Sequence, residues 1–146
     1  LYEPAMEGHR NLFFFTPLIA AMAGNVGVQS SAIIVQGIAN NALSGSLLKR
    51  LIKELSLSLL NGTILALILI LGSHFILGID YLTGFTVSLA LLSVIITASL
   101  IGTFIPIILD KYGIDPALAT GPFITTSNDI LGIIIFFSIA KVILGF

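Results

Sequence analysis

Charged residues are scarce in this sequence. Only 9% of its 146 residues are Asp, Glu, Lys or Arg, whereas about 25% of an average soluble domain is charged. Hydrophobic residues make up 57% of the chain. A soluble domain of this length has too little interior to hide so much apolar surface. The composition therefore indicates an integral membrane protein that lies in a lipid bilayer.

Other absences exclude several kinds of chemistry. The chain has no cysteine, which excludes disulfides, thiolate metal sites and a cysteine nucleophile. Its two histidines lie far apart in the sequence, which disfavours a zinc site. The net charge is −1 without a basic block, so nucleic-acid binding has no support. We find no nucleophile–base pair and no glycine-rich phosphate loop, so we expect no enzyme and assign no catalytic residue.

Four long apolar segments predict an all-α, polytopic membrane helix bundle that forms one transmembrane domain over residues 1–146. A helix needs about 20 apolar residues to cross the hydrocarbon core. The expected spans are residues 12–38, 55–79, 85–109 and 116–146. Pro116 suits the first turn of the last helix, with Asp115 as its cap, and we expect this helix to continue to Phe146.

Positive charge gives the expected orientation in a cell membrane. The loop of residues 39–54 carries three basic residues and the loop of residues 110–115 carries Lys111, whereas the loop of residues 79–84 has none. By the positive-inside rule the first two loops are cytoplasmic, and the C-terminus then lies outside. The chain starts at Leu1 with neither a methionine nor a signal-peptide pattern, which indicates a fragment or a processed chain.

Asp129 stands out because it interrupts a segment that is otherwise long and apolar enough to cross a bilayer. The other acidic residues lie at the ends of the apolar segments or between them. A lone ionisable group at membrane depth costs about 2.5–3.5 kcal/mol on insertion scales, so it indicates a functional site. At about 1.5 Å per residue, Asp129 is expected about 20 Å along the last helix, near the bilayer midplane.

Polar residues accompany Asp129 on one face of the expected helix, at spacings of three, four and seven. The members of this face are Pro122, Thr125, Thr126, Asp129, Gly132 and Ile133. We expect Pro122 to free the carbonyl oxygen of Leu118 from the helix. Hydroxyl, carbonyl and carboxylate oxygens suit Mg²⁺ or Ca²⁺, and a single carboxylate suits an ion that keeps most of its waters, as Mg²⁺ does.

Two interpretations of Asp129 follow from these residues. In a symmetric dimer, two Asp129 side chains would face each other across a pore, with a divalent cation between them. Alternatively, Asp129 only joins helices through hydrogen bonds or is protonated. We favour the cation site, because polar contacts between helices rarely need a full charge.

A second polar stretch, residues 24–31, interrupts the first span. Asn25 and Gln29 are four residues apart and share a helix face, while Gly24 and Gly27 allow another helix to approach closely. Two interpretations stay open at this point. The stretch either lines a pore with carbonyl oxygens or forms a packing seam with hydrogen bonds between helices.

Several of these segments resemble successive parts of one protein family. They are residues 24–30 and 35–39, residues 48–54, and residues 115–119 and 121–126 with Asp129 and Gly132. In that order they are similar to the second transmembrane helix, the following connector and the last helix of MgtE-type magnesium channels, which are related to the solute carrier 41 transporters. The resemblance covers nearly the whole chain.

The resemblance implies a homodimer that transports Mg²⁺ through a pore lined by the first and last spans. It implies a hydrated Mg²⁺ ion at Asp129, with the backbone carbonyl of Thr125 and the amide of Asn25 as further contacts. The other residues expected to line the pore are Gly24, Gln29, Gly121, Pro122, Thr126 and Gly132. The family also has its C-terminus outside, in agreement with the count of basic residues.

The sequence departs from the family pattern in three ways. The family has a further transmembrane helix before the equivalent of Leu12 and a large cytoplasmic sensor, and this sequence shows neither. Gating by intracellular Mg²⁺ is therefore not assigned to it. Gly121 stands where some members place Asn, and Gln36 where many place a basic residue. Two alternatives to a channel therefore stay open: an ion-coupled Mg²⁺ carrier of the same fold, and a non-transporting membrane subunit whose polar residues only pack helices.

Overall fold

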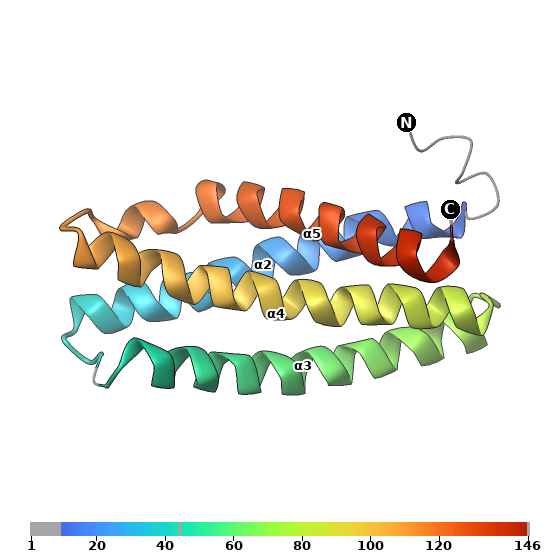
Figure 1. The fold of residues 1–146 in the computed structure, drawn as a ribbon, viewed down its shortest axis with the longest axis horizontal. Helices are drawn as coiled ribbons and strands as arrows, with labels where there is room; N and C mark the ends of the chain where they lie inside the picture. The colour runs from blue at the N-terminus through green and yellow to red at the C-terminus, as the bar shows by residue number, and fades with distance from the viewer. Residues whose placement is uncertain (1–9, 44, 146) are drawn as a thin grey trace.

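Four long helices run side by side in the computed structural model, which describes residues 10–43 and 45–145 (Figure 1). They are α2 (Asn11–Ala39), α3 (Leu47–Phe75), α4 (Tyr81–Lys111) and α5 (Pro122–Leu144), and a short 3₁₀-helix, η2 (Pro116–Ala119), precedes α5. The described residues contain no strand. All four membrane segments, the last counted from Pro116 to Leu144, are long and apolar enough to span a bilayer. The predicted all-α, multi-pass membrane bundle is confirmed, although Leu1 and Phe146 lie outside the described residues.

Capping side chains decide where two of the helices begin. The hydroxyl oxygen of Ser46 accepts a hydrogen bond from the backbone N–H of Lys49, so α3 begins at Leu47, eight residues before the expected apolar span. The carboxylate of Asp80 accepts one from the backbone N–H of Thr83 at 2.9 Å and starts α4. The basic residues between the first two spans therefore belong to the first turns of α3, and the connecting loop is short.

The last membrane segment is broken into two helices, whereas the sequence predicted one. Asp115 caps η2 by accepting a hydrogen bond from the backbone N–H of Ala117, as expected. Gly121 then adopts a φ of 63°, which favours glycine, and Pro122 begins α5. A proline in the first turn of a helix removes no intrahelical hydrogen bond. The prediction that Pro122 frees the carbonyl oxygen of Leu118 is therefore wrong.

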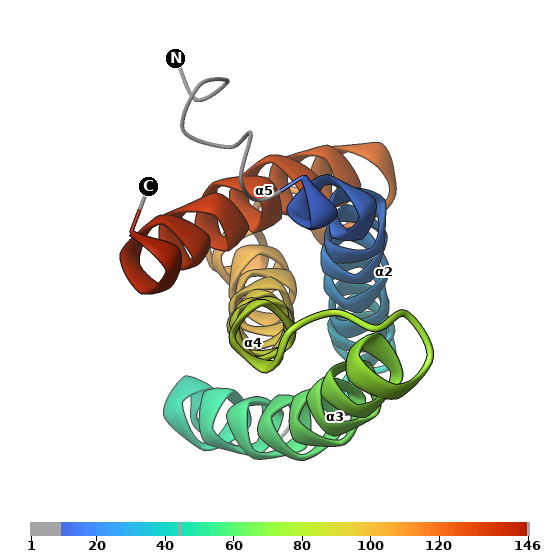
Figure 2. The same ribbon diagram turned by 90° about the vertical axis from the view of Figure 1, so that its right-hand side faces the viewer.

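The central helix of the bundle is α4. Seen end-on, it lies between α3 on one side and α2 and α5 on the other (Figure 2). Helices α2, α3 and α5 all pack on α4, and α2 also packs on α5, whereas α2 and α3 hardly contact each other. Most of the surface of α3 is consequently exposed, and its only buried residues are Ser58, Gly62 and Ser73.

The two ends of the bundle are packed differently. Near the α3–α4 turn the core is made of large apolar side chains, among them Leu12, Phe15, Ile19, Leu91, Val94 and Phe136. Towards the opposite end Ile34 and Ile124 are buried too, but small or polar buried residues are more frequent, among them Ser30, Ser31, Ser99, Thr103, Ala119 and Asn128. Small side chains allow the backbones of neighbouring helices to come close together in a membrane.

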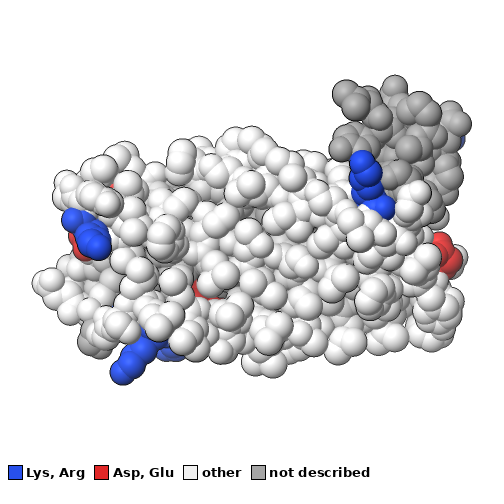
Figure 3. All heavy atoms as spheres, in the orientation of Figure 1, with Lys and Arg blue, Asp and Glu red and all other residues white. Residues whose placement is uncertain are grey.

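Charged side chains gather near the two ends of the bundle, and the middle of the face shown in Figure 3 is almost uncharged. This distribution is typical of a protein whose middle faces lipid. The α2–α3 loop and the loop before η2 lie at one end, and the α3–α4 turn lies at the other end with the C-terminus (Figure 1). Which end faces the cytoplasm stays a prediction.

Close contact between α2 and α4 occurs at Gly27 and Gly102. A Cβ atom added at Gly102 would overlap the backbone carbonyl oxygen of Gly27 and would also lie 3.1 Å from the Cβ of Ser30. The obstacle is backbone, which cannot rotate away as a flexible side chain can. Glycine at position 102 is therefore a requirement of the packing.

We expect Gly102→Ala to lower the free energy of unfolding by about 1–3 kcal/mol, because α2 and α4 must move apart to admit the methyl group. The midpoint of thermal unfolding of the purified protein in detergent measures the effect. Gly72→Ala on α3 is the matched control, since a Cβ there meets no atom within 4 Å. Equal midpoints for the two variants would contradict the close contact.

Candidate cation site

Asp129 lies in the second turn of α5, where this helix contacts α2. A Cβ atom added at Gly24 of α2 would lie 2.7 Å from Oδ1 of Asp129 and 3.0 Å from Cγ2 of Thr125. The absence of a side chain at Gly24 thus provides the space that the carboxylate occupies. Three residues expected at the site from the sequence, Gly24, Thr125 and Asp129, are brought together.

The carboxylate of Asp129 is partly buried and incompletely paired. Its Oδ1 atom is shielded from solvent and accepts no hydrogen bond from the part of the chain that the structure describes. A buried acceptor without a partner costs about 1–3 kcal/mol, and more if it is charged. The side chain as a whole still reaches the surface of the bundle. A cation, or water bound to a cation, is therefore able to reach the carboxylate from its accessible side, while Oδ1 itself stays shielded.

Two hydroxyl groups act near the start of α5, one across its contact with α2 and one within its own first turn. Ser31 of α2 donates a hydrogen bond to the backbone carbonyl of Ala119 in η2, which joins residues 88 positions apart. Thr125 donates one to the backbone carbonyl of Gly121 at 3.0 Å, within the first turn of α5. The bond from Ser31 joins the break before α5 to α2, and the bond from Thr125 holds the first turn of α5, which precedes Asp129.

The remaining predicted site residues are arranged in different ways. Four of them are exposed: Asn25, Gln29, Pro122 and Thr126. Gly121 is half-buried at the break before α5, and Gly132 is buried against α2, where an added Cβ would lie 2.9 Å from the Cβ of Ala23. Within the described residues no hydrogen bond joins Asn25 to Asp129. Gln29 borders a separate cleft between α2, α3 and α4.

Asn128 is a site residue that the sequence analysis did not identify. Its side chain is only 1% exposed, and neither its Nδ2 nor its Oδ1 has a hydrogen-bond partner in residues 10–43 and 45–145. It packs against Gly27, where an added Cβ would overlap the amide nitrogen. The sequence does show an amide next to Asp129 in an apolar helix. Helical spacing, however, puts Asn128 about 100° away from the face that carries Asp129, so it was not grouped with that face.

No group of three or more His, Asp or Glu side chains that could enclose a metal ion occurs in the described part of the chain. A cation at Asp129 would therefore meet one carboxylate and neutral oxygen atoms. Such a set suits an ion that keeps most of its water shell, which is the behaviour of Mg²⁺.

A comparison with protein families identifies the class of protein. The family model MgtE, described as a divalent cation transporter, matches residues 16–139. This chain belongs to the MgtE family. The match begins within α2 and ends within α5, so it reaches all four membrane segments, and it includes both Gly24 and Asp129. Membership in a family of transporters agrees with the prediction that the chain is not an enzyme.

Three curated relatives in the MgtE family are each named magnesium transporter MgtE. The protein of Bacillus subtilis is 38% identical over 140 residues, 95% of this chain and 31% of the relative. Those of Enterococcus faecalis and Thermus thermophilus are 35% and 31% identical, over 99% and 98% of this chain. Each of these two alignments covers 32% of the relative. The chain thus spans about a third of the length of these relatives.

We expect Gly27→Ala to lower the free energy of unfolding by about 1–3 kcal/mol, because the new methyl group overlaps the buried amide of Asn128. Adding Asn128→Ala should recover about 1 kcal/mol of the loss, since two residues in contact are coupled. Thermal unfolding midpoints of the wild type, both single variants and the double variant measure this coupling. Asn61→Ala, which removes an exposed amide on α3, should give no recovery. Additive effects of Gly27→Ala and Asn128→Ala would show that the two residues do not touch.

Proposed function

We propose that this chain transports Mg²⁺ across the membrane and that Asp129 binds the ion in transit. The observation that supports this most directly is the Asp129 carboxylate at a contact between two membrane helices, with a buried oxygen that no described residue pairs. Curated relatives that match nearly the whole chain are named magnesium transporters, which supports Mg²⁺ as the ion.

The proposed ion keeps most of its waters and contacts Asp129 through one or more of them. Water molecules around Mg²⁺ donate hydrogen bonds, so they can be held by carboxylate, carbonyl and amide oxygens alike. The carbonyl of Thr125, one turn before Asp129, and the amide of Asn25, next to Gly24, are the proposed further contacts. Full removal of the water shell is unnecessary, which fits a site with a single carboxylate.

We further propose a homodimer in which the exposed polar face beside Asp129 covers the same face of a second copy. Asn25, Pro122 and Thr126 are exposed on this side of the bundle, and lipid cannot pair with an amide or a hydroxyl. The proposed pore between the copies is lined by these residues with Gly24 and Gly121. Gly132 contributes by letting α5 approach α2, since it packs on Ala23.

The proposed orientation follows the basic residues. The end of the bundle with the α2–α3 loop carries Lys49, Arg50 and Lys53, and the loop before η2 begins after Lys111. By the positive-inside rule this end faces the cytoplasm, and the C-terminus lies on the opposite side.

Asp129→Ala should reduce Mg²⁺ flux into liposomes by about tenfold or more, because a hydrogen bond to a charged group contributes about 1.5–3 kcal/mol. Asp129→Asn tests the charge, since it keeps the size of the side chain. Flux is followed with a Mg²⁺-sensitive dye inside liposomes that contain the purified protein. Ser138→Ala, which removes an exposed hydroxyl farther along α5, is the matched control and should leave flux unchanged.

The same experiment separates a channel from its alternatives. We expect flux that does not depend on a Na⁺ or H⁺ gradient. A dependence on either gradient would support an ion-coupled carrier instead. Unchanged flux in Asp129→Asn would contradict the assignment of the ion to this residue, and absence of flux in the well-folded wild type would contradict transport by this chain.

A further inference from the structure

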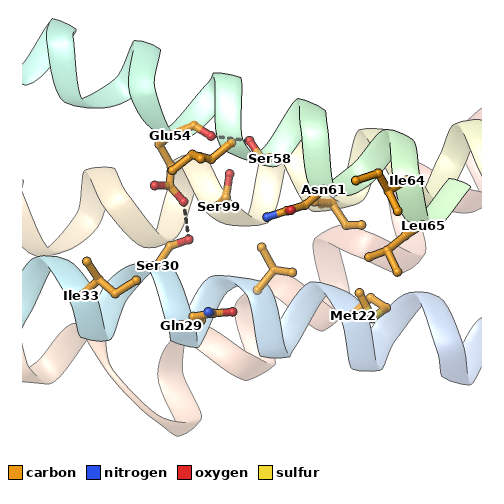
Figure 4. Close-up of a pocket in the computed structure, with 13 residues that line it drawn as sticks. Met22, Gln29, Ser30, Ile33, Glu54, Ser58, Asn61, Ile64, Leu65 and Ser99 are labelled. Carbon is orange, nitrogen blue, oxygen red and sulfur yellow. Dashed lines mark hydrogen bonds between the residues drawn. The ribbon is translucent and has the colours of Figure 1, made fainter.

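A second carboxylate, Glu54, is half-buried in a cleft of its own. The cleft has a volume of about 400 Å³ and is bounded by α2, α3 and α4. It exists because α2 and α3 both pack on α4 and hardly on each other. Figure 4 shows Glu54 extending from α3 across this opening towards Ser30 of α2.

The lining of the cleft changes from polar to apolar along its length. Its polar side chains are Gln29, Ser30, Glu54, Ser58, Asn61 and Ser99. Figure 4 shows these around Glu54 and in the middle of the cleft, while Met22, Ile64 and Leu65 close the far end. Lipid offers no hydrogen-bond partner to a polar side chain. Packing against lipid therefore does not explain six polar side chains from three helices, one of them a carboxylate.

Hydrogen bonds around Glu54 use the hydroxyl protons of three serines and leave oxygen lone pairs without a proton donor. The hydroxyl of Ser30 donates to Oε1 of Glu54 at 2.6 Å, and that of Ser58 donates to the backbone carbonyl of Glu54 at 2.7 Å. The hydroxyl of Ser99 donates to the carbonyl of Ile96. A hydroxyl whose proton is already donated can only accept or coordinate, and a carboxylate has about four acceptor positions, of which Ser30 uses one.

The size and chemistry of the cleft fit a hydrated divalent cation. Six waters occupy about 180 Å³ at about 30 Å³ each, so the cleft has room for an ion with its shell. Carboxylate, amide and hydroxyl oxygens are the ligands that Mg²⁺, Mn²⁺ and Ca²⁺ prefer. Glu54 lies two turns into α3, about 10 Å from its first residue, so the polar end of the cleft is near the end of the bundle that carries the basic residues.

The cleft is independent of the site at Asp129. The side of α2 that contains Gly24 and Gly27 contacts α5, whereas Val26, Ser30 and Ile33 of α2 border the cleft. A cation beside Glu54 therefore shares no ligand with one beside Asp129.

We propose that the cleft between α2, α3 and α4 is a second divalent-cation site, with Glu54 as its charged ligand and the amide oxygens of Gln29 and Asn61 as neutral ones. This site needs neither a pore nor a dimer, so it goes beyond the proposed transport function. A bound cation neutralises Glu54 and connects α3 to α2, two helices that otherwise join mainly through α4.

Binding of Mn²⁺ in an uncharged detergent tests the proposal, because free Mn²⁺ is measured directly by its electron paramagnetic resonance signal. The variant Asp129→Ala removes the other proposed site and should still bind Mn²⁺ saturably. Adding Glu54→Gln should weaken this binding by about tenfold or more. Glutamine keeps the size of the side chain and can still accept the hydrogen bond from Ser30, so the comparison isolates the charge. Adding Asp110→Asn instead removes an exposed carboxylate and should leave binding unchanged.

A second variant and a second measurement guard against a folding defect. Asn61→Leu in the Asp129→Ala background removes an amide oxygen at similar size and should also weaken Mn²⁺ binding. Mn²⁺ should raise the unfolding midpoint of Asp129→Ala but not that of Asp129→Ala with Glu54→Gln, since a ligand stabilises only the state that binds it. Equal Mn²⁺ affinity with and without Glu54→Gln would overturn the proposal. This outcome would leave the proposed pore site at Asp129 unaffected, because the experiment measures binding and not flux.

Discussion

Close contact of α2 with both α4 and α5 is the constraint on which the rest of the structure depends. At Gly24 the missing side chain leaves the space taken by the carboxylate of Asp129, and at Gly27 the backbone touches Gly102 and the amide of Asn128. These contacts place a costly charge and an unpaired amide in the same small-residue region. Polar groups at such positions restrict how the helices can pack, because any shift of α2 changes their surroundings.

Around this contact the bundle has a half dominated by large apolar side chains and a polar half, in which small and polar buried residues are more frequent. Large side chains near the α3–α4 turn form a core that resists rearrangement, since closely packed interiors tolerate little change in volume. The polar half contains both carboxylates discussed above, Glu54 and Asp129, on different sides of α2. In a low-dielectric setting, two unneutralised carboxylates are costly, so the cations proposed at the two sites would allow both to remain charged.

The break before α5 connects local sequence to the geometry of the site. The sequence correctly predicted the cap at Asp115, but a proline at position 122 was interpreted as an interruption inside one helix. The structure has Gly121 with positive φ followed by Pro122 as the start of a new helix, anchored to α2 by Ser31. Asp129 therefore lies only about two turns from a helix start, and the rise of one straight helix does not describe its depth.

The sequence by itself determined the class of protein and the four membrane segments, and it singled out Asp129 as the candidate site. Length and apolarity decide whether a segment can cross a bilayer, and a charge within such a segment is recognisable without knowing its neighbours. The tertiary structure alone revealed the burial of Asn128, the partnership of Ser30 with Glu54 and the cleft around them. Membrane helices are apolar on nearly every face, so their sequence pattern does not specify which face meets which partner. That choice depends on small residues of different helices that fit together only in the folded bundle.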